Sequence, residues 1–189
     1  RTMRDEGYKL PFICNGSGYH KPEIITEMAD IFDIFLPDIK YNTSSLSKQC
    51  INTDDYEDFA FSALALMCEQ KGFLQPFDTT GKTVAEKGVL VRHLVLPGQL
   101  GNTFGLLKKL RREFGRMLPL SVMSQFRPTP RCQRKNLFTR CINRQEYEAV
   151  VELLHELDFR QVFLQPDFGD PGFTPDFNRQ NPFPGNREC

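Results

Sequence analysis

The sequence predicts an α/β fold built on parallel strands. Segments with strand-like and helix-like patterns alternate in the order βαβαβαβαβ, which is typical of a parallel sheet or barrel. The segment 88–97 (GVLVRHLVLP) is apolar on both faces, as a parallel strand covered by helices requires. The 189 residues, 40% of them hydrophobic and 25% charged, fit one globular domain and exclude disordered, collagen-like and coiled-coil chains.

Two more strands and two helices are expected before that segment. Residues 10–14 (LPFIC) have the short apolar pattern of a buried strand, and the Asn-Gly-Ser-Gly run after them ends it. Pro22 suits the first turn of a helix, and a second strand is expected at 33–41 (DIFLPDIKY). Thr53 is expected to cap a longer helix that ends at Gly72.

The second half continues the alternation. Thr103 is expected to cap a helix that ends at Gly115, and residues 118–123 read as the fourth strand. Residues 143–146 (NRQE) place a glutamate three positions after an asparagine, which is the capping box that begins a helix. Residues 161–165 (QVFLQ) are the fifth expected strand.

The last residues have a different composition. Residues 166–189 contain five prolines and three glycines, which oppose regular structure, and four phenylalanines, which offer apolar anchors. We therefore expect a domain over residues 1–165 and an irregular segment over 166–189 packed on its surface. A free tail or a partner-binding segment is the alternative.

The number and spacing of the cysteines and the lengths of the apolar runs indicate in which cellular compartment the protein is expected. The six cysteines are widely spaced, with no CxxC or Cys/His zinc pattern, and are too few for a disulfide scaffold. This usage favours a reducing, cytoplasmic setting. No apolar run approaches the roughly 18 to 20 residues of a membrane span, so no membrane partner is expected. The 24 basic and 24 acidic residues cancel, so net charge excludes no class of partner.

Polar residues follow the first two strands, at the ends where parallel α/β folds hold their ligands. Residues 14–19 (CNGSGY) combine two glycines, which let a ligand approach the backbone, with the polar groups of Asn15 and Ser17. A tight turn would have the same composition. Asp38 and Lys40 are two positions apart in a strand and share a face. Because buried unpaired charge is costly, they need a ligand or each other, as a structural ion pair.

The later strands add further candidates. Arg92 shares a face of its apolar strand with Leu94, and we expect it to meet a carboxylate, either that of Asp38 or that of a ligand. His93 points to the other face and is expected to be a satisfied core histidine rather than a metal ligand. Gln125 ends the fourth strand, where it can hydrogen-bond a ligand, although a surface glutamine would look the same.

Positive charge is concentrated between positions 108 and 144, where eleven Lys/Arg residues accompany one acidic residue. Such a block can attract an acidic protein or a nucleic acid. No aromatic stacking pattern interleaves it, so nucleic acid is the less favoured partner. A cluster-free α/β binding module with a basic face is therefore an alternative function. A phosphate- or nucleotide-binding barrel enzyme that uses Asp38, Lys40 and Arg92 without iron is a third.

Four motifs taken in order carry a family resemblance: CNGSGY, FDIFLPDIKY, VRHLVLPG and VMSQF. Together they resemble the C-terminal half of a radical S-adenosylmethionine (radical SAM) protein of the branch related to pyruvate formate-lyase activating enzyme, over about residues 10–165. The resemblance implies the C-terminal part of a partial (β/α)6 TIM-like barrel that holds a [4Fe-4S] cluster and S-adenosylmethionine. In this family the reduced cluster splits S-adenosylmethionine to a 5′-deoxyadenosyl radical. In the activating enzymes that radical takes a hydrogen atom from a glycine of a protein substrate, which is the implied partner.

The resemblance also implies which residues contact S-adenosylmethionine, none of them catalytic or a metal ligand. The methionyl part would lie near residues that follow the first two strands: Asn15, Gly16, Ser17, Asp38 and Lys40. The nucleoside would lie near residues of the later strands: Arg92, Leu94 and Gln125.

The sequence departs from the family pattern in three places. The CxxxCxxC loop that holds the cluster and the glycine-rich segment that binds the amino group of S-adenosylmethionine are both absent. We therefore expect this chain to be the second half of the barrel, inactive alone, with the cluster ligands in a preceding part. A family fold that has lost its cluster is the alternative. Asn15 and Gln125 stand where activating enzymes have an acid and a histidine, so the resemblance is to the superfamily more than to glycyl-radical activation.

Overall fold

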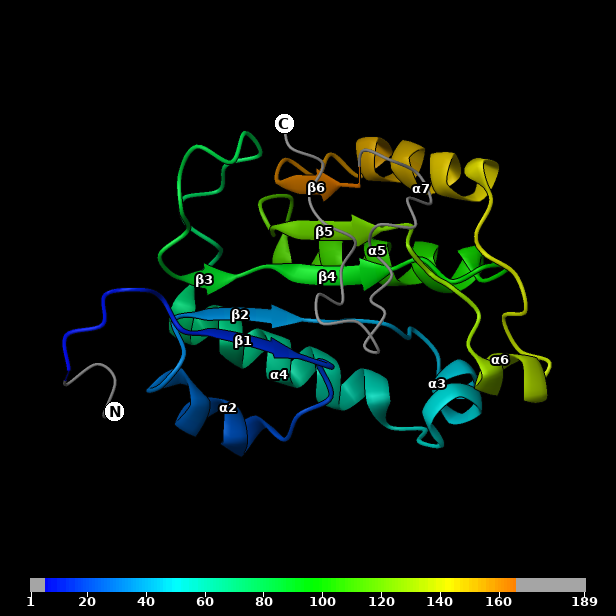
Figure 1. Ribbon diagram of the computed structural model, residues 1–189, viewed down its shortest axis with the longest axis horizontal. Coiled ribbons are helices and arrows are strands. Elements are labelled where there is room, and N and C mark those ends of the chain that lie inside the picture. Colours follow the sequence, from blue (N-terminus) through cyan, green and yellow to red (C-terminus); the bar gives the residue numbers. More distant parts are fainter. Residues whose placement is uncertain (1–5, 166–189) are drawn as a thin grey trace, which may run out of the picture.

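The computed structural model describes residues 6–165, which form an α/β fold (Figure 1). Its strands form two three-stranded sheets in which every neighbouring pair is parallel, so the parallel α/β prediction is confirmed. Over the described residues the strands do not close into a barrel. One sheet contains β1 (Ile13–Gly16), β2 (Ile34–Pro37) and β3 (Gly88–Val89), and the other β4 (Val91–Leu94), β5 (Leu120–Met123) and β6 (Val162–Leu164).

Helices connect the strands, and the longest two lie behind the sheets in Figure 1. These two helices are α4 (Tyr56–Lys71) and α5 (Leu100–Phe114). The others are α2 (Pro22–Ala29), α3 (Ser44–Ile51), α6 (Pro130–Arg134) and α7 (Arg144–Glu156).

The two sheets adjoin along β2, β3 and β4. The Leu90 N–H donates to the Phe35 carbonyl (3.0 Å), and the Ile39 N–H donates to the Arg92 carbonyl (2.9 Å). Asp38 and Arg92 also form an isolated parallel bridge. The strands therefore lie side by side in chain order, and their carboxyl ends share one edge.

The strand expected at 88–97 is interrupted at Leu90 because its neighbour changes there. The Val89 N–H donates to the Gly72 carbonyl, whereas the Val91 N–H donates to the Pro119 carbonyl, next to β5. The second half alternates strictly, with Val91 and His93 buried and Arg92 half-buried on the opposite face. The expectation of burial on both faces is therefore wrong for β4.

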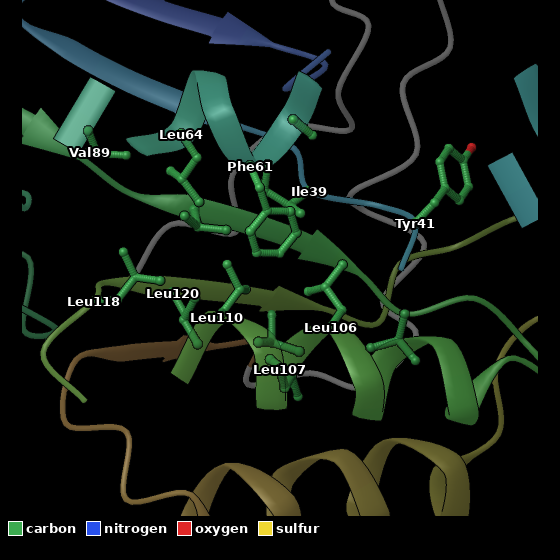
Figure 2. Close-up of a cluster of buried hydrophobic side chains, with 14 of the residues drawn as sticks. Ile39, Tyr41, Phe61, Leu64, Val89, Leu106, Leu107, Leu110, Leu118 and Leu120 are labelled. Atoms are coloured by element: carbon green, nitrogen blue, oxygen red, sulfur yellow. The ribbon is translucent and has the colours of Figure 1, made fainter. Parts of the chain in front are cut away.

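The hydrophobic core lies between the strands and the helices (Figure 2). Figure 2 shows Phe61 and Leu64 of α4 and Leu106 and Leu110 of α5 gathered in this core. Each is at most 6% exposed, and on the order of 1.5–3 kcal/mol accompanies the burial of each such side chain. The core therefore fixes which face of each strand the helices cover.

Two helix starts differ from the expectation, and two additional short helices, α3 and α6, are present. Thr53 does not cap a helix: α4 begins after Asp55, and the additional helix α3 precedes it, capped by the Thr43 hydroxyl. The short, mostly polar sequence of α3 lacks the apolar periodicity that predicts a helix. The helix expected to start at Thr103 begins at Leu100, and Thr103 is fully buried inside it.

The capping box of α7 is confirmed and reaches beyond its own helix. The Asn143 side chain accepts from the Glu146 N–H (2.8 Å), and the Glu146 carboxylate accepts from the Asn143 N–H (2.9 Å). The same carboxylate binds both terminal nitrogens of Arg140 and accepts from the Gly98 N–H (2.7 Å). Glu146 therefore holds the loop that follows β4.

We expect Glu146→Gln to lower the free energy of unfolding by about 1–3 kcal/mol at neutral pH, because it removes a charged acceptor that is 11% exposed. The Arg140 guanidinium and the two backbone donors lower the pKa of Glu146 from 4.5 to about 2. This stabilisation is therefore complete above about pH 4.5 and is lost as the pH falls toward 2. Urea unfolding of both proteins between pH 7 and pH 2.5 should show the difference shrinking. The exposed Glu148→Gln control should show no such trend; an equal loss in both variants would contradict this role.

Among the helices of residues 6–165, none has both the length and the apolar composition needed to cross a bilayer. The five cysteines in this part of the chain are free thiols.

Candidate functional site

Seven of the eight candidate residues extend from the side of the sheets opposite α4 and α5. Their neighbours in sequence point the other way: Cys14 and Ile39 contact the core, and the His93 imidazole bonds to Thr103 of α5. The alternation predicted from the sequence is therefore confirmed for the two strands on which it was predicted, β2 with its continuation and β4. We call this surface the open face, and its residues are Asn15, Ser17, Asp38, Lys40, Arg92, Leu94 and Gln125.

Asp38, Lys40 and Arg92 form an ionic triad at the middle of the open face. The Arg92 Nη2 and Nε lie 2.6 and 2.7 Å from Asp38 Oδ1, and Lys40 Nζ lies 3.3 Å from Asp38 Oδ2. The side chains are 19% (Asp38), 35% (Lys40) and 24% (Arg92) exposed. The mutual ion pair expected as one alternative is present, but two cations share one carboxylate. The triad thus carries one net positive charge.

Residues after β1 come into contact with the triad through Gly18. The strand runs to Gly16, two residues beyond the expected end, so Asn15 lies in the strand rather than in a turn. Gly18 has φ +77°, and a Cβ there would lie 2.5 Å from the Asp38 carbonyl oxygen. Only glycine allows this approach without strain. The loop after β1 therefore packs directly on the backbone of the triad.

Gly16 is the candidate that lies apart from the open face. Its carbonyl accepts from the Asp38 N–H (2.9 Å), and a Cβ there would lie 2.7 Å from His20 Nε2. The His20 imidazole thus covers Gly16, and its buried Nε2 has no hydrogen-bond partner among the described residues. His20 was not predictable as part of the site, because a lone histidine after a glycine-rich loop has no distinctive sequence pattern.

Tyr56 of α4 joins the loops that follow β1 and β2. Its hydroxyl accepts from the Lys40 N–H (3.0 Å) and lies 2.9 and 3.2 Å from the carbonyl oxygens of Asp38 and Ser17, which share its proton. Its side chain is 1% exposed, and burial raises the pKa of the phenol. The phenol therefore stays neutral and able to donate.

We expect Tyr56→Phe to lower the free energy of unfolding by about 1–3 kcal/mol, because the Lys40 N–H and the Asp38 carbonyl would be buried without this partner. Hydrogen exchange should also show faster exchange of the Lys40 amide. The matched control is Tyr8→Phe at a residue that is 55% exposed, where we expect no measurable change. Equal stability of the two variants would contradict the role given to Tyr56.

Two buried polar residues position the continuation of β2. The His93 ring bonds the Ile39 carbonyl through Nδ1 (2.7 Å) and Thr103 Oγ1 through Nε2 (3.0 Å), so the expected satisfied core histidine is confirmed. Its ring is 1% exposed, and burial lowers its pKa. Asn102 accepts from the Asn42 N–H (2.7 Å) and donates to the Lys40 carbonyl (2.9 Å). The backbone on both sides of Lys40 is therefore fixed.

Gln125 lies at the far side of the open face, after β5. Its amide Nε2 contacts Met123 Sδ at 3.7 Å, a weak acceptor, and the side chain is half-buried. Ser124, next to it, is tied to Gln165 by its N–H (2.9 Å) and hydroxyl (3.1 Å). The carboxyl ends of β5 and β6 are thus held together, and among residues 6–165 the Gln125 side chain has no hydrogen-bond partner other than Met123.

A pocket of about 240 Å³ opens at the carboxyl ends of β2, β4 and β5, between α3 and α6. Most of its wall is aromatic and aliphatic, and two open-face residues, Lys40 and Leu94, belong to it. The cations in the lining are Lys40, Arg131 and Lys135, and among the described residues the lining contains no acidic side chain. The other lining residues are Tyr41, Gln49, Cys50, Leu96, Phe126, Thr129, Cys132, Leu137 and Phe138.

The two thiols of this pocket differ in acidity. Burial raises the pKa of Cys50, in spite of the opposing effects of Tyr41 and Lys135. Hydrogen bonds from Thr129 lower the pKa of Cys132, with a smaller contribution from Arg131. Cys132 is therefore the more readily ionised thiol and the better nucleophile at neutral pH.

The basic block of residues 108–144 does not form one free surface. Lys109 pairs with Glu57 (2.6 Å), Arg111 donates to the Leu157 carbonyl (2.7 Å), and Arg112 pairs with Glu113 (3.1 Å). Two of the four α5 cations, Lys109 and Arg111, are thus engaged with other parts of the domain, whereas the Arg112 side chain is 71% exposed. The remaining charge lies largely near α6, beside the pocket.

Neither a group of metal ligands nor a known relative indicates a function for the described residues. No three Cys, His, Asp or Glu side chains within residues 6–165 are grouped so that they could hold a metal ion. A scan of the chain against protein-family models matches none, and a search of curated proteins finds no significant match.

Proposed function

We propose that this chain is the C-terminal part of a radical SAM enzyme with a partial (β/α)6 barrel, and that its open face binds S-adenosylmethionine. The observation that carries the proposal is the Asp38–Lys40–Arg92 triad at the carboxyl edge of parallel strands. The strands follow one another in chain order with α4 and α5 on one side, which suits the inner face of such a barrel. The resemblance of the four ordered motifs supports the same assignment.

The charge of the triad favours a carboxylate ligand. Two cations share one aspartate, so the amino-acid carboxylate of S-adenosylmethionine would offset the one net positive charge of the triad, with the ammonium and sulfonium groups of the ligand directed away from Lys40 and Arg92. Arg92 can donate to that carboxylate through nitrogens left over from Asp38, and charge-assisted bonds of this kind are about twice as strong as neutral ones. The partial exposure of the triad leaves it accessible to a ligand.

Other residues of the open face suit the remaining parts of the molecule. Asn15 in β1 and Ser17 directly after that strand are exposed polar residues next to the triad, and they suit the methionyl amino group. Leu94 offers an apolar surface for the nucleoside, and the Gln125 amide can pair with the adenine edge or the ribose.

The cluster lies outside the described residues in this proposal. Its three cysteine ligands do not occur as a group in residues 6–165, so they would come from a preceding part of the protein. Such a cluster, when reduced, supplies the electron that cleaves S-adenosylmethionine to a 5′-deoxyadenosyl radical. The residues of this chain would bind and orient S-adenosylmethionine. The free thiols fit a cytoplasmic, reducing setting.

Titration calorimetry with S-adenosylmethionine and with 5′-methylthioadenosine tests the assignment. The second compound keeps the nucleoside but lacks the carboxylate. We expect S-adenosylmethionine to bind at least about tenfold more tightly at low salt, because only its carboxylate meets the triad. Equal affinities, or no binding of either compound at millimolar concentration, would contradict the proposed site.

A further inference from the structure

The pocket between α3 and α6 lies beside the triad and shares Lys40 with it. Its walls combine the aromatic rings of Tyr41, Phe126 and Phe138 with leucine side chains. At about 240 Å³ it is smaller than the roughly 300–1,000 Å³ of sites for drug-sized ligands. The pocket can therefore enclose only a compact apolar group.

The charges around this pocket have one sign. Arg131 and Lys135 lie one turn apart at α6, their side chains are exposed, and no described acidic residue pairs with either. Lys40 lines the same pocket from the end of β2, with Asp38 as its only described acidic partner. A ligand that buries its apolar part here would place a terminal group between these cations, and an anionic group is favoured there.

We propose that this pocket binds a small organic anion, an aromatic or branched apolar body that ends in a carboxylate or a phosphate. The apolar body would lie against Phe126 and Phe138, and the anionic end would lie between Lys40, Arg131 and Lys135. Because Lys40 and Leu94 belong to both regions, the ligand would lie beside S-adenosylmethionine. Its position beside S-adenosylmethionine rests on the proposed function, but its binding to the pocket does not.

Binding is tested on the full chain with three probes that share a phenyl ring. The probes are 3-phenylpropionate, phenyl phosphate and the uncharged 3-phenylpropan-1-ol. We expect at least one anion to bind at least about tenfold more tightly than the alcohol at low salt. The tighter of the two anions identifies the preferred head group. Equal affinity for the alcohol and both anions, or no binding of either anion at millimolar concentration, would overturn the proposal.

A charge variant locates the site. Arg131→Gln combined with Lys135→Gln should weaken binding of the preferred anion about tenfold, because charge-assisted contacts are lost. Arg134→Gln is the control, since Arg134 is on the same short helix but not in the pocket lining. Both variants change exposed residues, and their melting temperatures should match that of the wild type within a few degrees. Equal weakening of binding in the two variants would overturn the proposal.

Thiol alkylation gives a local readout that does not depend on affinity. Cys132 lines the pocket, whereas Cys141, also half-buried, does not. The preferred anion should slow alkylation of Cys132 by iodoacetamide and leave the alkylation rate of Cys141 unchanged. Protection of neither thiol would count against the pocket.

None of these measurements uses S-adenosylmethionine, and neither Arg131 nor Lys135 belongs to the proposed S-adenosylmethionine site. Failure of this proposal is thus distinguishable from failure of the proposed function.

Discussion

Gly18→Ala should destabilise the protein by about 3 kcal/mol or more, the largest effect that we expect from one substitution near the site. The residue has φ +77°, where an alanine is strained, and the added Cβ would lie 2.5 Å from the Asp38 carbonyl oxygen and 3.0 Å from Ile39 Cδ1. The loop after β1 must then move away from β2. Urea unfolding of the variant measures the loss.

Gly101→Ala is the control for that substitution. Gly101 lies in α5 with open space around it and no positive φ, so an alanine there should stabilise the protein by about 0.5–1 kcal/mol. If the free energy of unfolding falls in Gly18→Ala and rises in Gly101→Ala, the loss at Gly18 is due to the close approach there and not to a general effect of removing glycine. A stable Gly18→Ala protein would show that the contact between the two loops is dispensable.

Arg92→Gln should produce the largest loss of S-adenosylmethionine affinity, about tenfold or more at low salt. The substitution removes the cation closest to Asp38, so the triad becomes neutral before the ligand arrives. Affinity for 5′-methylthioadenosine should change little, because that compound has no carboxylate. Calorimetry with both compounds on both proteins measures the coupling between Arg92 and the carboxylate.

The control for Arg92→Gln is Arg116→Gln. Arg116 is also paired with an aspartate, Asp158, at 3.1 Å, but this pair is exposed and does not lie on the open face. Arg116→Gln should leave the affinities for S-adenosylmethionine and 5′-methylthioadenosine unchanged. A loss of affinity for both compounds in Arg92→Gln would instead indicate that the substitution disturbs the fold of the site.

The periodicity of strands allowed part of the open face to be predicted from sequence. Residues two apart share a face, so Asp38 with Lys40, and Arg92 with Leu94, were predicted as neighbours before any fold was known. The partnership of Asp38 and Arg92 was one of two alternatives, because the sequence does not show which strands adjoin. The capping box at Asn143 was predictable because its whole geometry is local.

The supports of the site were not predictable because they come from distant residues whose local pattern is ordinary. In the sequence, Tyr56 has the pattern of an apolar helix residue and Thr103 that of a helix cap. In the structure both are buried in helices, where Tyr56 donates to the Asp38 carbonyl and Thr103 bonds the His93 ring. The pocket depends on α3 and α6, two short polar helices without apolar periodicity. The expected packing of residues 166–189 lies outside the described residues.

Anaerobic iron–sulfide reconstitution tests the central claim most directly. It should be carried out on this chain and on the protein translated from the natural start codon of its reading frame, with the absorbance of the cluster and the formation of 5′-deoxyadenosine as readouts. The account predicts that the longer protein gains a cluster and cleaves S-adenosylmethionine under reducing conditions, and that Arg92→Gln in that protein slows the cleavage. A longer protein that gains no cluster and forms no 5′-deoxyadenosine would contradict the account.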